Sequence, residues 1–216
     1  MMRRIVRVCA ITLFVLTYFP RSCDCIVLAA NEGSTGIIGE WAFDKVKLAE
    51  LANSFEHAHP YPYVVIDNFF TPEMANRIDQ GFPVPNGTST EWQQQGWHIY
   101  DNPIEGKLAH DNLEMMSNHD SVFPTMWDAL QSNQLVNIMK EVTGIEGLEN
   151  DPHLHGGGLH YHPRGSRLEM HLDYSIHPIS KKERRVNLII YMNRDWKPEW
   201  GGDLALWEGT LDGLKK

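Results

Sequence analysis

Residues 158–174 read Gly158-Leu-His-Tyr-His-Pro-Arg-Gly-Ser-Arg-Leu-Glu-Met-His171-Leu-Asp173-Tyr174. In an extended strand, residues two positions apart point to the same face, so His171 and Asp173 can present an imidazole and a carboxylate to one ion. A neutral nitrogen and a hard oxygen beside open positions suit ferrous iron. Because His-x-Asp occurs by chance in many chains, the pair alone indicates a metal site only weakly.

The sequence around this stretch predicts short strands over 159–161, 168–172, 186–192 and 204–207, separated by turn signals. The front half predicts mainly helices, over 39–57, from Thr71 onward with Pro72 in its first turn, and over 122–143 up to Gly144, with a strand over 63–67 and a loop over 82–96. A helical front and a strand-rich back predict an α+β fold built on a sandwich or barrel.

Composition limits the classes of function. The chain has 216 residues, enough for one domain with a real core. Its formal net charge is −9, so the surface repels polyphosphate and a nucleic-acid partner is not expected.

Residues 1–30 are predicted to be a signal peptide. Arg3 and Arg4 form a basic start, and the apolar run Val8 to Phe19 that follows is shorter than the ~20 residues needed to span a bilayer as a helix. Small residues up to Ala30 offer a cleavage point, and Ser22 offers another. The alternative is a short buried helix of the domain.

A signal peptide predicts a place in the secretory pathway, either extracellular or in the lumen of the endoplasmic reticulum or Golgi. All three cysteines, Cys9, Cys23 and Cys25, lie in this leader, so its removal after Ala30 would leave no disulfide framework. Asn86-Gly87-Thr88 is a glycosylation sequon in a stretch predicted to be an exposed loop.

Three further motifs accompany residues 158–174 in a fixed order. They are Pro60-Tyr61-Pro62-Tyr63-Val64-Val65-Ile66-Asp67-Asn68-Phe69-Phe70, Arg184-Arg185-Val186-Asn187-Leu188-Ile189-Ile190-Tyr191-Met192-Asn193, and Trp200-Gly201-Gly202-x-Leu204-x-Leu206-Trp207. Together they resemble the 2-oxoglutarate/Fe(II) dioxygenases of the prolyl 4-hydroxylase-like family, over roughly residues 58 to 210. The resemblance implies a double-stranded β-helix (jelly-roll or cupin-like) with N-terminal helices. It divides the chain into the leader 1–30, a helical segment 31–57 and a partial dioxygenase domain 58–216.

The resemblance also implies roles for single residues. His171 and Asp173 match the first two iron ligands. Tyr191 matches a tyrosine that binds the 2-oxoglutarate carboxylate, and Tyr161, or His162 with a one-residue shift, matches another cosubstrate-facing position. The family couples oxidation of 2-oxoglutarate to hydroxylation of a C–H bond, and ascorbate commonly keeps its iron reduced. The expected substrate is a peptide, including a prolyl peptide, or a small molecule.

The family pattern asks for a third ligand, a histidine several dozen residues further on, followed by a basic residue for the cosubstrate. The sole histidine after Asp173 is His177, which Pro178 follows in a predicted turn. The upstream histidines His153, His155, His160 and His162 are expected to be polar rim and turn residues. The closing strands and the third ligand are therefore expected to be missing, which would make this sequence an inactive fragment.

Other polar and aromatic residues have simpler interpretations. Arg184 and Arg185 are expected to be solvated or salt-bridged at the start of a strand. Trp196 and Trp200 are expected in the core, whereas Trp207 is a candidate substrate contact. Two further functions remain open: a non-catalytic secreted β-sandwich binding module on the same scaffold, and a cupin-like or lectin jelly roll, which leaves the His-x-Asp motif unexplained.

Overall fold

The computed structural model describes residues 6–15, 24–29, 36–102, 105–194, 196–210 and 213–215; for 6–15, 24–29, 209–210 and 213–215 it describes the backbone alone. Helices and strands are both abundant, so the α+β class is confirmed. The double-stranded β-helix stays a prediction, because the strands form one large mixed sheet and a separate two-stranded one.

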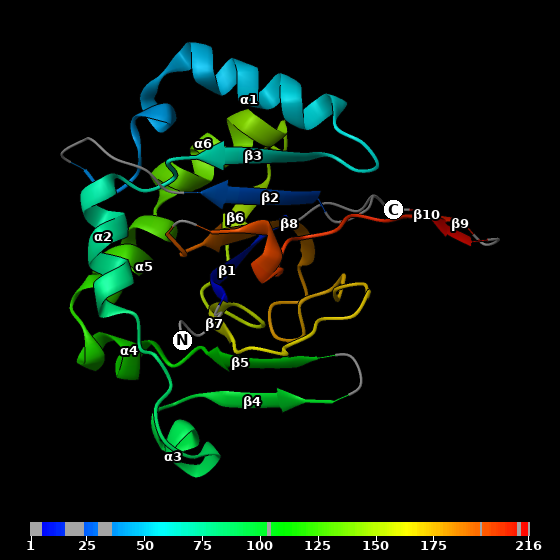
Figure 1. Cartoon of the computed structure of the whole chain (residues 1–216). Helices are drawn as coiled ribbons and strands as arrows, with labels where there is room; N and C mark the ends of the chain where they lie inside the picture. The colour runs from blue at the N-terminus through cyan, green and yellow to red at the C-terminus, as the bar shows by residue number, and fades with distance from the viewer. Residues whose placement is uncertain are drawn as a thin grey trace.

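The helices lie mostly in the front two thirds of the chain. They are η1 (Glu40–Phe43), α1 (Lys45–His57), α2 (Pro72–Gly81), α3 (Ser89–Gln94), α4 (Leu113–His119), α5 (Val122–Leu130), α6 (Asn133–Thr143) and the short η2 (Pro198–Trp200). Figure 1 shows α1 and α6 beside one edge of the sheet and α2, α4 and α5 gathered at one end of it.

The large sheet has the strand order β3-β2-β8-β1-β7-β5-β4, and β6 also pairs with β1. Its strands are β1 (Val6–Val15), β2 (Asp24–Ala29), β3 (Tyr63–Asp67), β4 (His98–Asp101), β5 (Gly106–His110), β6 (Leu148–Asn150), β7 (Gly158–His162) and β8 (Glu183–Tyr191). β9 (Glu208–Thr210) and β10 (Gly213–Lys215) form a hairpin that projects away from this sheet in Figure 1.

The predicted leader supplies two strands of the sheet. β1 lies antiparallel between β8 and β7, and β2 lies parallel between β8 and β3. Both lateral partners of β8 are therefore residues from 1–30. The signal peptide stays a prediction, and cleavage after Ala30 would remove both strands and leave β8 without a neighbour in this sheet.

The two faces of the sheet differ in chemistry. Val186, Leu188 and Ile190 of β8 are fully buried, as are Leu159 of β7 and, nearly so, Ile66 of β3. These side chains join those of the helices in one core cluster. Because strand residues alternate between faces, the intervening residues of β7 and β8 form a second face that carries polar side chains.

Helix α1 belongs to the same core as the residues that follow it. Its Leu48, Leu51 and Phe55 are buried among the side chains of later helices and strands. Residues on both sides of position 57 thus share one core cluster, and the division of the chain at that position stays a prediction. Asp44 caps α1 and accepts hydrogen bonds from two backbone N–H groups.

Local signals placed several elements correctly. Thr71 caps α2 with Pro72 in its first turn, the strand over 63–67 is β3, and Gly144 ends α6 with a positive φ of 69°. The single helix predicted over 39–57 is η1 followed by α1, and the one predicted over 122–143 is α5 followed by α6.

Three predicted segments were wrong in part. The loop over 82–96 contains α3, whose Thr88 and Glu91 form a capping box. Residues 168–172 form a single bridge, between Leu168 and Glu105, and then leave the ladder. Residues 204–207 have no regular structure, and the strand begins only at Glu208. In both strand cases alternating apolar residues predicted a ladder, but no strand in the described part of the chain pairs with these residues to complete it.

Candidate functional site

His171 and Asp173 lie in an irregular connection between β7 and β8. The connection is fixed at one end by the Leu168–Glu105 bridge and at the other by a bridge between Ile176 and Glu183. The predicted strand is absent here, yet the two side chains still approach each other: His171 Nε2 lies 3.5 Å from Asp173 Oδ1, and each side chain is about a third exposed (34%).

The backbone fixes the tautomer of His171. Its Nδ1 lies 2.7 Å from the carbonyl oxygen of Glu169. A carbonyl can only accept, so Nδ1 carries the proton and donates it, and Nε2 keeps its lone pair on the side that faces Asp173. A hydrogen bond of this kind orients histidine ligands in metal sites.

Asp173 shares its carboxylate between two partners. Its Oδ2 lies 3.2 Å from Nη2 of Arg184, whose side chain is only 6% exposed, while Oδ1 faces His171. The guanidinium carbon of Arg184 also lies 4.8 Å from the ring centre of Tyr174. The expectation that Arg184 is solvated or salt-bridged is confirmed in its second form, because the side chain is buried and paired with Asp173.

A β-bulge explains how Arg184 reaches this site. Leu13 pairs with Val186, but the next residue of β1, Phe14, pairs with Arg184, so Arg185 is the extra residue. The extra residue reverses the alternation, and Arg184 therefore points to the same face as Asn187 and not to the core face of Val186. Arg185 is also buried, at 9% exposure, and its Nη1 lies 3.8 Å from Glu183.

A buried histidine and aspartate lie behind Tyr174. His177 is fully buried, and its Nδ1 accepts hydrogen bonds from the backbone N–H groups of Ile179 and Ser180 at 3.1 and 2.9 Å. Its proton is therefore on Nε2, which faces Asp151 Oδ1 at 3.6 Å. Burial lowers the pKa of His177, although Asp151 opposes this shift. The predicted turn at His177 is confirmed, and its ring nitrogens are directed at the backbone and Asp151.

The same cluster includes two of the upstream histidines. His153 stacks on His177 at 5.6 Å between ring centres, and His155 meets it edge to face at 5.3 Å. Asp151 accepts the backbone N–H groups of both, each at 2.9 Å, and the Tyr174 hydroxyl donates to the carbonyl of His155 at 2.7 Å. The expectation of turn residues holds for His153 and His155.

His160 and His162 lie on a strand and not in a turn, so that part of the expectation is wrong for them. They belong to β7, half-buried, with ring centres 6.4 Å apart. Burial, with a smaller effect of Lys107, lowers the pKa of His160 to about 3 and that of His162 to about 4. Both imidazoles are therefore neutral at neutral pH.

The two tyrosines predicted to face the cosubstrate lie on opposite faces of the sheet. Tyr161 is 7% exposed in the core, beside Trp97 at 6.1 Å between ring centres. Tyr191 aligns with His160 through their common partner Val8, so it shares a face with His160 and His162. Of the two predicted alternatives, His162 is thus the one on the face of Tyr191.

Tyr191 donates its hydroxyl to the carbonyl of Gly202 at 3.0 Å. Burial, with Asp203 nearby, raises its pKa to about 12. Tyr191 is seven residues along β8 from Arg184, which corresponds to roughly 20 Å at the usual rise of a strand. The structure thus brings His171 and Asp173 together, and Tyr191 lies toward the other end of β8 from Arg184.

The three tryptophans Trp196, Trp200 and Trp207 lie near the surface. Trp196 is 39% exposed and donates its indole N–H to the carbonyl of Gly201 at 3.1 Å, and Trp200 is half-buried. The core assignment for these two is wrong, because among the described residues the 201–207 segment has no regular structure that could form a second layer over them. Trp207, the candidate substrate contact, is 36% exposed.

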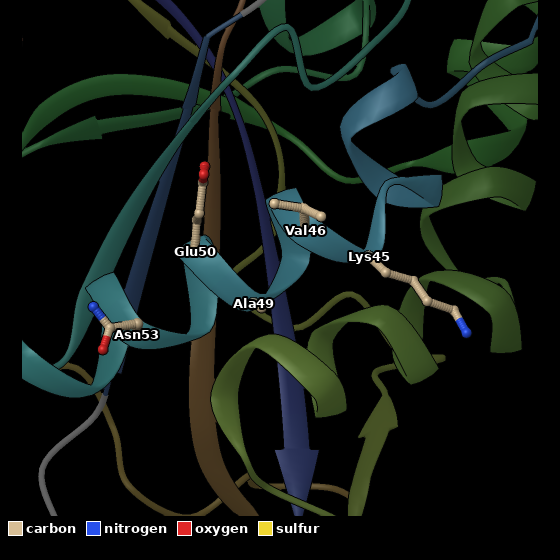
Figure 2. Close-up of a pocket in the computed structure, with 5 residues that line it drawn as sticks. All are labelled: Lys45, Val46, Ala49, Glu50 and Asn53. Atoms are coloured by element: carbon tan, nitrogen blue, oxygen red, sulfur yellow. The ribbon is translucent and has the colours of Figure 1, made fainter.

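Within the described part of the chain, no group of three or more His, Cys, Asp or Glu side chains is arranged to hold a metal ion. Figure 2 shows a shallow apolar hollow on α1, lined by Lys45, Val46, Ala49, Glu50 and Asn53. None of the candidate site residues lines it. Among the described residues, no helix is long and apolar enough to cross a membrane.

Comparison with known proteins supports one family. Residues 157–214 match the model of the 2OG-Fe(II) oxygenase superfamily. This segment contains His171, Asp173, Arg184 and Tyr191, and the match supports a member of that superfamily without distinguishing the prolyl 4-hydroxylase-like group. Searches of the curated proteins and of the solved structures give no match.

Proposed function

We propose that this protein is a 2-oxoglutarate- and Fe(II)-dependent dioxygenase that hydroxylates a peptidyl substrate, including a prolyl one, or a small molecule. The observation that carries the proposal is the approach of His171 Nε2 to Asp173 Oδ1 at 3.5 Å. It occurs inside the segment that matches the oxygenase superfamily.

The chemistry of these two residues suits ferrous iron. His171 offers an oriented lone pair, and Asp173 offers one carboxylate oxygen beside it. Ferrous iron held there would supply the activation of O₂, with which 2-oxoglutarate is converted to succinate and CO₂ while the substrate is hydroxylated. The proposal needs a third ligand, so the activity belongs to a form of the protein that contains one. In that form the strands are proposed to complete a double-stranded β-helix.

The polar face of the sheet is the proposed side for 2-oxoglutarate. Tyr191 and the neutral His162 point to it from β8 and β7. His162 can donate a hydrogen bond to a carboxylate, and Tyr191 can do so only in place of its hydrogen bond to the carbonyl of Gly202. Tyr161, the other predicted position, would have to act from the core face. Trp207 is proposed on the substrate side, and ascorbate is proposed as the reductant.

The test measures succinate released from 2-oxoglutarate in the presence of Fe(II), together with Fe(II) binding by calorimetry. We expect binding by the chain and turnover by a product that also carries a third histidine ligand. Asp173→Asn should abolish both signals, whereas Glu208→Gln, at an exposed position of the same segment, should leave them intact. Equal iron binding by wild type and Asp173→Asn would contradict the proposal.

A specific observation favours a second candidate, a secreted binding module without catalysis. The described residues contain no three-ligand group of the kind an iron enzyme uses. Such a module would stay folded with no response to Fe(II) or 2-oxoglutarate. A rise in Tm on adding both together would contradict it, because ligands that bind the folded state raise its stability.

We also propose that the protein enters the secretory pathway. The basic-then-apolar start supports this, and the sequon residue Asn86 is exposed in the loop before α3. Thr88, the third residue of the sequon, caps α3. Asn86→Gln should remove a glycan with no loss of the cap, whereas Thr88→Ser should keep both. Absence of any glycan on the product of a eukaryotic secretory host would count against this localisation.

A further inference from the structure

The guanidinium of Arg184 is held in place by the carboxylate of Asp173 and the ring of Tyr174. The bulge at Arg185 turns Arg184 away from the core face, and its side chain is 6% exposed. The ring of Tyr174 lies 4.8 Å from the guanidinium, and Tyr174 is itself anchored by its hydrogen bond to the carbonyl of His155. A cation over an aromatic face is attracted by the ring quadrupole, which favours this one orientation.

The guanidinium of Arg184 pairs with one carboxylate oxygen of Asp173, and the other oxygen is directed at His171. Nη2 of Arg184 lies 3.2 Å from Oδ2, while Oδ1 faces Nε2 of His171 at 3.5 Å. A carboxylate whose second oxygen is engaged can give a metal only one oxygen. Asp173 is also the one acidic partner that the described residues bring within ion-pair distance of Arg184.

We propose that Arg184 is a positioning residue for the iron site: it holds Asp173 so that Oδ1 alone is presented beside Nε2 of His171. The inference rests on the proposed function. The buried His177 packs against both His153 and His155, and it thereby holds together the two loops that contain Tyr174 and its partner His155. A carboxylate held as a single-oxygen ligand leaves more positions on the ion open for other ligands.

Two physical effects of removing Arg184 oppose each other. Loss of a nearby positive charge favours a divalent cation, but Asp173 is 34% exposed and water screens that repulsion. Loss of an outer partner of a metal ligand typically weakens metal binding by about 10–100-fold. The second effect is the larger one here, because the salt bridge and the ring contact fix Asp173 in an otherwise irregular loop.

The test uses Co(II) as the probe in place of Fe(II), with affinity measured by calorimetry and coordination by visible absorption. Arg184→Met should weaken Co(II) binding by about tenfold or more and change the absorption spectrum, because the freed carboxylate can bind through both oxygens. Arg184→Lys should give a Co(II) affinity between those of the unsubstituted chain and Arg184→Met, since an ammonium keeps the charge but lacks the planar set of donors. The matched control is Arg185→Met, a buried arginine one residue away that is paired with Glu183, which should change the affinity less than about twofold.

Three outcomes are distinguishable. Equal or tighter Co(II) binding by Arg184→Met than by the unsubstituted chain would overturn the positioning role and leave the proposed function standing. No Co(II) binding by the unsubstituted chain would overturn the proposed function and this inference with it. If Arg184→Met does not fold, Tyr174→Leu gives the decision: it removes the ring under the guanidinium and should weaken binding severalfold, and unchanged binding would refute the role.

Discussion

The Nδ1 atom of His171 donates a hydrogen bond to the carbonyl oxygen of Glu169 at 2.7 Å, two residues earlier in the chain. This contact orients the ring without help from a strand. It turns Nε2 toward Asp173, so that the two groups form half of a metal-binding arrangement in an irregular loop.

His171→Ala should therefore lower the affinity for Fe(II) or Co(II) by more than about 100-fold, because a direct ligand contributes more than the outer contacts that are worth about 10–100-fold. Calorimetry under anaerobic conditions measures the change. His119→Ala removes an exposed histidine at the end of α4 and should leave the affinity unchanged. An unaltered affinity in His171→Ala would remove the basis for an iron site.

The sequence predicted this pair for a reason that only partly applies. Strand alternation places residues 171 and 173 on one face, but these residues form a loop, and the hydrogen bond to Glu169 has taken over the orienting role. That bond depends on the loop conformation, which is fixed by the local Ile176–Glu183 bridge and by the Leu168–Glu105 bridge to a distant part of the chain. Local periodicity carries no information about such bridges.

The position of Arg184 was beyond sequence reasoning for a similar reason. Its face depends on the bulge, and the bulge depends on the register between β8 and β1, which are far apart in sequence. For Tyr161 and His162, the sequence predicts their relative orientation but not which of them is buried. Alternation says that they point to opposite faces, but only the assembled sheet shows that the core lies on the side of Tyr161.

Removal of residues 1–30 from this chain should expose both edges of β8. Every residue of β8 except the bulged Arg185 would lose its lateral partners, and Val186, Leu188 and Ile190 would lose the strands that flank them on both sides. Unpaired strand edges associate with other chains. We expect the shortened protein to form aggregates or soluble oligomers, measured by light scattering and size-exclusion chromatography. Removal of residues 1–5 alone, which precede β1, is the control and should leave the protein monodisperse to the same extent as the full chain.

His162 should make stability depend on acidity. Burial, and to a smaller extent Lys107, lowers the pKa of His162 to about 4 from the ordinary value of 6.5 that it has in the unfolded chain. Between these values the unfolded chain binds the proton and the folded one does not, so stability is fully present above about pH 6.5 and falls as the pH drops toward 4. The loss should be roughly 1–3 kcal/mol.

Urea unfolding between pH 7 and pH 4 measures this effect. His162→Gln removes the titrating group, so its free energy of unfolding should fall less steeply across that range. His119→Gln, at an exposed position, should follow the wild-type curve. Identical slopes for wild type and His162→Gln would show that His162 is as accessible to protons in the folded protein as in the unfolded chain.

His177 and Asp151 should be coupled in stability although 26 residues separate them in the sequence. His177→Ala leaves the N–H groups of Ile179 and Ser180 without their acceptor and opens space beside His153 and His155, so it should cost about 2–4 kcal/mol. Ile179→Ala, 58% exposed in the same turn, should cost less than about 0.5 kcal/mol.

Adding Asp151→Asn completes a double-mutant cycle in urea, and a coupling of about 0.5–3 kcal/mol is expected for groups in contact. Strict additivity would mean that the 3.6 Å approach of Nε2 to Asp151 carries no interaction.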